Sequence, residues 1–231
     1  MKTLAIDTAT EGCSVALWDN GELSTSVKVE PRMHADLILG MVEELLINAD
    51  LKISQMDFVS FGRGPGAFTG VRIATGVIQG MAFGADLPVV PVSTLRALAQ
   101  RSWSENQHPF VLSAFDARME EVYWGAYQLD DNKLMQPVIE ERVCHPQHVE
   151  LPPGFTPDTW TGAGSGWQVY DEQLQSALGV TTLIRYPDLI SRAEEILLLS
   201  LDDYQKGLAV SADKALPVYL RNKVAKKKGE K

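Results

Sequence analysis

Hydrophobic and polar residues follow two spacings along the chain, and these spacings predict where strands and helices lie. Short apolar runs bounded by turn residues are typical of strands, and apolar positions three or four residues apart are typical of helices. The predicted strands cover 2–8, 13–18, 22–29, 57–61 and 88–92. The predicted helices cover 33–49, 69–84 and 94–102. Three strands followed by alternating helix and strand predict a mixed sheet flanked by helices.

A second set of elements begins near residue 110 and resembles the first. Residues 114–126 can be laid over residues 5–17, because both segments have an apolar strand, an aspartate, a short turn and a second strand. The other elements expected here are a strand near 137–143, a strand that ends in 161–166, and helices near 168–178 and 189–206. An internal repeat of this kind suggests two related halves.

The polar, proline-containing stretch 106–109 is the best candidate for a hinge between the halves. We therefore predict an N-terminal subdomain over 1–105 and a second, degenerate subdomain over 106–210. The C-terminal segment 211–231, with its basic tail, is expected to return to the first subdomain. A further irregular stretch, 151–157, is expected to be a surface loop inside the second half.

Composition and charge narrow the functional class. The chain has 231 residues, 45% hydrophobic and 22% charged, with a net charge of −9, which disfavours a large basic face for nucleic acid. The basic run 221–228 is an exception, and it is either a solvated tail or a contact for RNA or a partner. No apolar run is long enough to span a membrane, the start does not resemble a signal peptide, and the two cysteines cannot build a disulfide framework. A cytoplasmic location is expected.

The stretch FGRGPGAFTGVRI, at 61–73, concentrates glycine between a strand and a helix. Such a turn can bind an anion through free backbone N–H groups and the helix dipole. A phosphate loop of the Walker A type would need a Gly-Lys-Ser/Thr sequence, and no lysine occurs between Ile53 and Lys133. A dinucleotide fingerprint would need a third glycine at set spacing and an acidic residue after the next strand, and both are missing.

The helix that follows carries Gly76, Gly80 and Gly84 along one stripe. Each glycine inside a helix costs roughly 1 kcal/mol relative to alanine, so three in register call for a reason. Close packing on this chain's own elements, contact with a helix of another protein chain, and a bound ligand are the three alternatives.

Other candidate residues give weaker signals. Asp7 and Asp116 each follow a strand, where an aspartate can hold a metal–phosphate group, act as a general base or cap a turn. His145 and His148 have a metal-like spacing without a third ligand. No Gly-x-Ser-x-Gly elbow supports nucleophilic hydrolysis.

Four sequence blocks together resemble one family. They are Ile6–Ala9 with Cys13–Leu17, Gly64–Ile73, Asp116–Met119 with Glu121–Tyr123, and Pro217–Arg221. The chain resembles the bacterial tRNA threonylcarbamoyladenosine biosynthesis family TsaB, also called YeaZ, over nearly its whole length. The resemblance implies the α/β fold of actin, sugar kinases and heat-shock chaperone ATPases, with two related subdomains whose mixed sheets are flanked by helices.

The resemblance also implies a role without catalysis. Such a protein supports the larger paralogue TsaD, which modifies adenosine 37 of tRNA, and the small ATPase TsaE joins the pair. TsaD binds its metal through an Asn-His-x-x-x-His run, and Thr94 and Leu98 stand where this chain would need the histidines, so no metal site and no catalytic residue are expected. Glu11 in the turn after Asp7 would repel phosphate, so we expect no cofactor on this chain alone, and ATP or ADP only in the complex.

The glycine stripe is then expected to dock on the paralogue, or on a second copy as a homodimer when the paralogue is absent. The predicted interface consists of His34, Leu37, Ile38, Met41, Leu45, Arg72, Ile73, Gly76, Val77, Gly80, Met81 and Gly84. A vestigial nucleotide loop is predicted at Asp7, Thr8, Gly64 and Gly66. The rival hypotheses are an autonomous metallopeptidase or kinase-like ATPase on the same fold, and a tRNA-binding module. Contact with tRNA is expected through the complex, and contact with a membrane is not.

Overall fold

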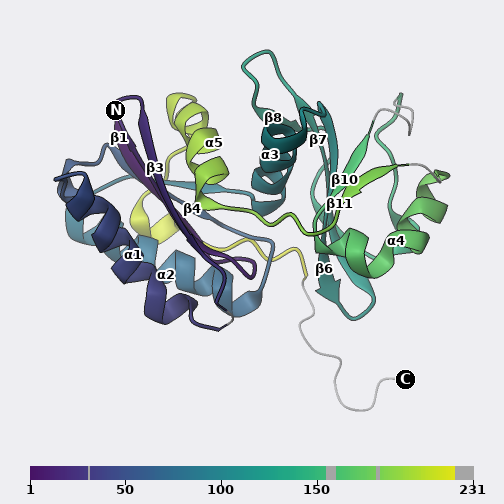
Figure 1. Ribbon diagram of the computed structural model, residues 1–231, viewed down its shortest axis with the longest axis horizontal. Coiled ribbons are helices and arrows are strands. Elements are labelled where there is room, and N and C mark those ends of the chain that lie inside the picture. Colours follow the sequence, from purple (N-terminus) through teal and green to yellow (C-terminus); the bar gives the residue numbers. More distant parts are fainter. Residues whose placement is uncertain (31, 155–159, 181–182, 222–231) are drawn as a thin grey trace.

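The computed structural model describes residues 1–30, 32–154, 160–180 and 183–221, and it contains two halves, each built on one sheet (Figure 1). The first half contains β1 (Lys2–Asp7), β2 (Cys13–Asp19), β3 (Glu22–Lys28), α1 (His34–Asn48), η1 (Ile53–Gln55), β4 (Phe58–Gly62), α2 (Phe68–Ala85), β5 (Val89–Val92) and α3 (Thr94–Asn106). The second contains β6 (Phe110–Arg118), β7 (Glu121–Leu129), β8 (Met135–Pro137), β9 (Arg142–Cys144), η2 (Pro146–His148), β10 (Thr161–Ala163), α4 (Ser165–Leu178) and β11 (Ile184–Tyr186). The last elements along the chain are α5 (Ala193–Gln205) and η4 (Ala212–Lys214).

The two sheets share one strand order, which bears out the prediction of two related halves. The first sheet runs β3-β2-β1-β4-β5, and the second runs β8-β7-β6-β10-β11 with β9 also paired to β7. In both sheets the first three strands of that order are antiparallel, and the last two join in parallel. The hairpin β6–β7 therefore corresponds to β1–β2, as the overlay of 114–126 on 5–17 predicted.

Helices cover both faces of each sheet, and two of them are exchanged between the halves. Helices α1 and α2 pack together on one face of the first sheet, and α5 covers the opposite face, where Tyr204 stacks on Phe58 at 4.3 Å between ring centroids. In the second half, α4 covers one face and α3 the other. Helix α3 follows the first sheet but packs on the second, and α5 does the reverse, so the two crossing helices lie against each other between the halves (Figure 1).

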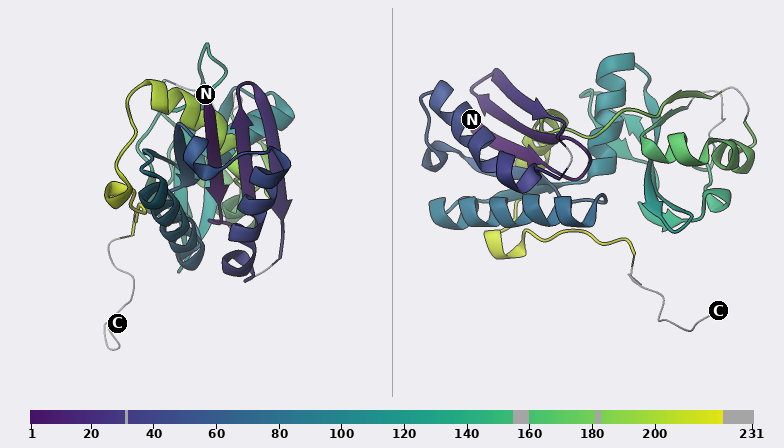
Figure 2. Two further views of the ribbon diagram at one scale, coloured as in Figure 1. Left: turned by 90° about the vertical axis from the view of Figure 1, so that its left-hand side faces the viewer. Right: turned by 60° about the horizontal axis from the view of Figure 1, so that its bottom comes forward.

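The described part of the C-terminal segment lies against the first half. Val210 pairs with Val89 at the edge of the first sheet, and Ala215 is buried in the core beneath α2. The N–H of Val218 then donates to the carbonyl oxygen of Arg63 at 2.9 Å. Figure 2 shows this segment running along α2 before the chain end. The basic tail from residue 222 onwards lies outside the described residues, as do residues 155–157 of the predicted loop.

Some element boundaries differ from the sequence prediction. The single strand expected near 137–143 is two three-residue strands, β8 and β9, and β11 was not predicted because three residues carry too weak a pattern. The helix expected over 189–206 begins only at Ala193. Helix α5 was also grouped with 106–210, whereas its buried side contacts the first sheet. None of the described helices has the length and hydropathy needed to cross a bilayer.

Candidate docking surface and glycine loop

The glycine-rich stretch 61–73 closes around the turn that follows β1. A Cβ atom added to Gly70 would lie 1.9 Å from the carbonyl oxygen of Thr8, and one added to Gly66 would lie 2.4 Å from that of Ala9. The N–H of Ala67 donates to the same Ala9 oxygen at 2.8 Å. The backbone that approaches the glycines is therefore the chain's own turn, and the absence of side chains is what allows that contact.

The structure brings together only part of the predicted vestigial nucleotide loop, because Gly66 lies against the turn after β1 whereas Gly64 lies against Val71 and Val218. Gly64, with φ of +94°, precedes the cis peptide bond of Pro65, and Gly66 contacts the turn that Asp7 and Thr8 begin. The hydroxyl of Thr8 donates to the carbonyl oxygen of Gly70 at 2.6 Å. The Thr8 hydroxyl and the Ala67 N–H, two donors that could meet a phosphate at this position, are thus engaged within the chain.

Asp7 is buried completely, and its carboxylate is hydrogen-bonded inside the chain. One oxygen accepts from the N–H of Ala9 at 2.9 Å, and the other accepts from the hydroxyl of Ser191, which precedes α5. Burial raises the pKa of Asp7, although these hydrogen bonds and the charge of His34 oppose the shift. Asp7 therefore joins the first turn to the segment that precedes α5.

Asp116, the counterpart in the second half, caps a turn. Its carboxylate accepts from the N–H of Arg118 at 2.8 Å and from the hydroxyl of Tyr170 at 3.3 Å, and it also pairs with the Arg118 guanidinium at 3.0 Å. Of the roles left open for this residue, the geometry favours turn capping.

Thr94 and Leu98 lie in the first two turns of α3, and both are buried. The Thr94 hydroxyl donates to the carbonyl oxygen of Pro65, so this position helps to hold the glycine loop. Leu98 lies in the core between α3 and the second sheet. Across the described ranges, no three His, Cys, Asp or Glu side chains gather as metal ligands, and the rings of His145 and His148 lie 6.0 Å apart.

The glycine stripe of α2 faces outward. A Cβ added to Gly76, Gly80 or Gly84 would meet no described atom within 4 Å, and all three residues are exposed. Among the described residues, this excludes packing on the chain's own elements, which was one of the three alternatives. We use the term α1–α2 face for the outward sides of α1 and α2 around these glycines.

Large apolar side chains stand exposed on the same two helices. Phe83 is 85% exposed, Ile47 67% and Leu39 57%. Sequence reasoning missed these residues and also Gly40 of α1, which has open space around it. Their positions on the helical wheel, opposite the buried residues, would have revealed them. An apolar surface of this kind on a monomer is typical of an interaction site.

The structure corrects part of the predicted interface. Ile38, Met41 and Leu45 are buried in the core of the first half, because they lie on the side of α1 that faces the sheet, and so they cannot contact a partner. The remaining apolar positions are half-buried at the border of the α1–α2 face. These are Leu37, Ile73, Val77 and Met81.

The two polar candidates lie at the same end of the helices. His34 is half-buried, and its Nε2 atom has no hydrogen-bond partner among the described residues. Arg72 is exposed, with its guanidinium 3.8 Å from the ring centroid of Phe68 and its Nε donating to the Tyr219 hydroxyl at 2.8 Å. The C-terminal segment is therefore fastened beside the α1–α2 face.

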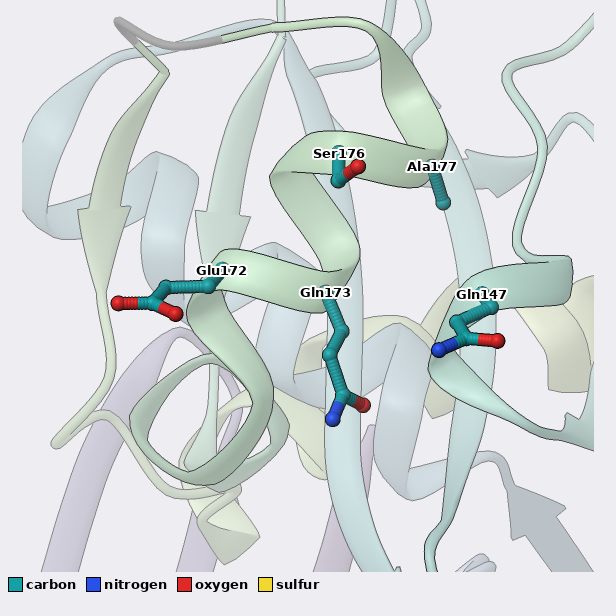
Figure 3. A pocket seen from close by; sticks show the side chains of 5 residues that line it. All are labelled: Gln147, Glu172, Gln173, Ser176 and Ala177. Carbon is teal, nitrogen blue, oxygen red and sulfur yellow. The ribbon is translucent and has the colours of Figure 1, made fainter.

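A shallow pocket in the second half lacks the side chains that a catalytic site would need. It lies between η2 and α4, and Figure 3 shows Glu172 pointing away from Gln147. The other lining residues are Gln173, Ser176 and Ala177. One carboxylate among neutral side chains does not supply an acid and base pair.

The two sheets, their shared strand order and the exchanged helices define an actin-like α/β protein. The family model described as TsaD, tRNA N6-adenosine threonylcarbamoyltransferase, matches residues 28–228. The TsaB protein of Escherichia coli K12, a tRNA threonylcarbamoyladenosine biosynthesis protein, is 41% identical over 99% of this chain and 98% of its own. The chain belongs to the TsaB family, also called YeaZ.

Solved structures agree with this assignment. YeaZ from Pseudomonas aeruginosa is 44% identical, covers 95% of this chain and 99% of its own, and superposes with a TM-score of 0.88. A second structure with the same values is described as an uncharacterized protein with similarity to peptidase YeaZ from Pseudomonas aeruginosa.

Proposed function

We propose that this chain is a scaffold and activator subunit, without catalytic groups of its own, in the synthesis of N6-threonylcarbamoyladenosine at adenosine 37 of tRNA. The TsaD paralogue is its catalytic partner, and the ATPase TsaE joins them. The complex works in the cytoplasm and holds the tRNA and any ATP or ADP.

The α1–α2 face is the observation that carries this proposal. Gly76 and Gly80 lie in the interior of α2 and cost roughly 2 kcal/mol in total relative to alanine, and no contact within the described chain offsets that cost. A partner helix that lies against the stripe can approach more closely than side chains would allow, and Phe83, Ile47 and Leu39 would then be buried. The same face pairs two copies when the partner is absent, so the homodimer competes with the heterodimer.

The test is association with a TsaD-type partner by size-exclusion chromatography with light scattering. Gly80→Leu places a bulky side chain in the middle of the stripe, and we expect affinity to fall at least about tenfold. Ala177→Leu is the matched control, because it adds a similar volume to an exposed position of α4 in the second half. Circular dichroism confirms that both variants fold. Full affinity in Gly80→Leu would contradict the proposal.

The alternative function is that of an autonomous metallopeptidase or kinase-like ATPase. One solved relative is described as similar to a peptidase, which is the observation that favours this alternative. The closed glycine loop and the buried Thr94 and Leu98 favour the scaffold instead. The discriminating experiment measures ATP turnover and peptide cleavage by the isolated chain, with a metal-depleted control. Turnover by the isolated chain would refute the scaffold role.

A direct tRNA-binding role has one candidate, the basic tail. Truncation after Val224 should weaken tRNA binding by the assembled complex if the tail contacts RNA, and unchanged binding would dismiss it.

A further inference from the structure

Strand β3 is an open edge of the first sheet. It pairs with β2 along all seven of its residues, Glu22–Lys28, and no other described strand pairs with it. The opposite edge, β5, is closed by the bridge between Val89 and Val210. An exposed strand edge is a template for another strand unless charges, proline or a covering element protect it.

The hairpin turn determines which backbone groups face that edge. Residues 20–21 form a two-residue turn with φ of 49° and 112°, so Asp19 and Glu22, which flank it, form a hydrogen-bonded pair. Hydrogen-bonded and non-hydrogen-bonded pairs alternate along an antiparallel ladder. The residues that direct N–H and C=O groups outward are therefore Leu23, Thr25 and Val27.

The sequence of β3, ELSTSVK, is complementary to itself when reversed about Thr25. In an antiparallel pair of two copies, Glu22 lies opposite the partner's Lys28, and Leu23 lies opposite the partner's Val27. The outward-facing residues then meet each other as hydrogen-bonded pairs. The charged residues fall in the closer, non-hydrogen-bonded pairs, where opposite charges attract.

Other arrangements lose these interactions. A parallel pair places Glu22 opposite Glu22, and a shift of two residues leaves both charges unpaired. Neither Glu22 nor Lys28 makes an ion pair within the described part of the chain, so both are free to pair across the edge. We propose that β3 is a self-complementary edge through which two copies of this chain join their first sheets into one antiparallel sheet.

This association is independent of the α1–α2 face, because it uses backbone groups at the sheet edge and none of the α2 glycines. A variant with Gly80→Leu should still form it, and a partner on the α1–α2 face should not compete for β3. The expected assembly then contains two copies of this chain joined at β3.

The experiment is sedimentation velocity at tens of micromolar, with Gly80→Leu present in every sample to remove association through the α1–α2 face. Glu22→Lys creates two like-charge pairs in the dimer, and so does Lys28→Glu, so each should weaken dimerisation at least about tenfold. The double variant restores opposite charges and should dimerise as the parent does.

The mixture of the two single variants gives the most decisive test of the charge pairing. A dimer of either single variant contains two like-charge pairs, which repel. A dimer of one Glu22→Lys chain and one Lys28→Glu chain contains two pairs of opposite charge, so the mixture should form a heterodimer. A parent that stays monomeric, single variants that dimerise as the parent does, or a mixture without heterodimer would each overturn the proposal. Circular dichroism checks that each variant folds. We expect that they do, because both substituted residues are exposed.

Discussion

At the scale of single residues, the glycines divide into two groups with opposite physical reasons. Gly66 and Gly70 face the backbone of the turn after β1, where no side chain has room. Gly76, Gly80 and Gly84 face open space, so nothing inside the described chain requires them. The first group serves the fold, and the second is available to serve an interaction.

Alanine substitution separates the two groups. Gly80→Ala should stabilise the isolated chain by roughly 1 kcal/mol, because it improves helix propensity without a clash. Gly70→Ala should destabilise it by more than about 2 kcal/mol, because its Cβ would overlap the carbonyl oxygen of Thr8. Urea denaturation at a concentration too low for self-association measures both changes. Equal effects at the two positions would show that the stripe is also packed internally.

At the scale of elements, α5 carries an uncompensated acidic group into the interior. Glu195 lies in its first turn, is buried, and has one carboxylate oxygen without a hydrogen-bond partner among the described residues. Burial, together with the neighbouring charge of Glu194, raises the pKa of Glu195 to about 8, although Arg101 and Arg192 oppose the shift. The helix N-terminus favours the ionised form, but desolvation outweighs it.

This group makes stability fall as pH rises. Between the unfolded pKa near 4.5 and the folded pKa of about 8, the folded chain binds a proton that the unfolded chain has released. The free energy of unfolding should therefore decrease from about pH 5 to pH 8, by an amount on the order of a few kcal/mol. In Glu195→Gln this part of the decrease should vanish. Urea midpoints across that range provide the measurement, and parallel pH curves for the two proteins would contradict the prediction.

At the scale of the whole molecule, the exchanged helices α3 and α5 hold the halves together. The Arg96 guanidinium donates to both carboxylate oxygens of Asp203 at 2.8 and 2.9 Å, and its Nε donates to the carbonyl oxygen of Met135 at 2.7 Å. Both charged side chains are largely buried. One arginine thus joins α3, α5 and the region of β8.

Removal of that arginine should weaken the whole fold. Arg96→Met leaves the Asp203 carboxylate buried without its partner, which costs about 3–5 kcal/mol. Lys206→Met is the matched control, because it breaks the more exposed pair with Asp202 on the same helix and should cost less than about 1 kcal/mol. Urea denaturation of both variants tests this, and a loss below about 1 kcal/mol in Arg96→Met would contradict the role assigned to the pair.

Much of the fold could be predicted from local patterns, whereas the candidate site could be predicted only in part. The strand–aspartate–turn–strand repeat at 5–17 and 114–126 indicated two related halves, and the sheets have the same order. The short strands β8 and β9 were predicted as one strand and β11 was missed, because three residues carry too weak a pattern. Within α1, periodicity identified Ile38 and Met41 as apolar but did not show that they face the sheet and not a partner.

The sequence alone determined the family blocks, the periodic elements and the glycine stripe. All of these depend on residues near each other along the chain. Only the tertiary structure decided which side of each helix is buried, what the glycine loop touches, and which half α5 covers. Those outcomes depend on contacts between residues far apart in sequence, such as Asp7 with Ser191 and Arg96 with Asp203, which local pattern does not encode.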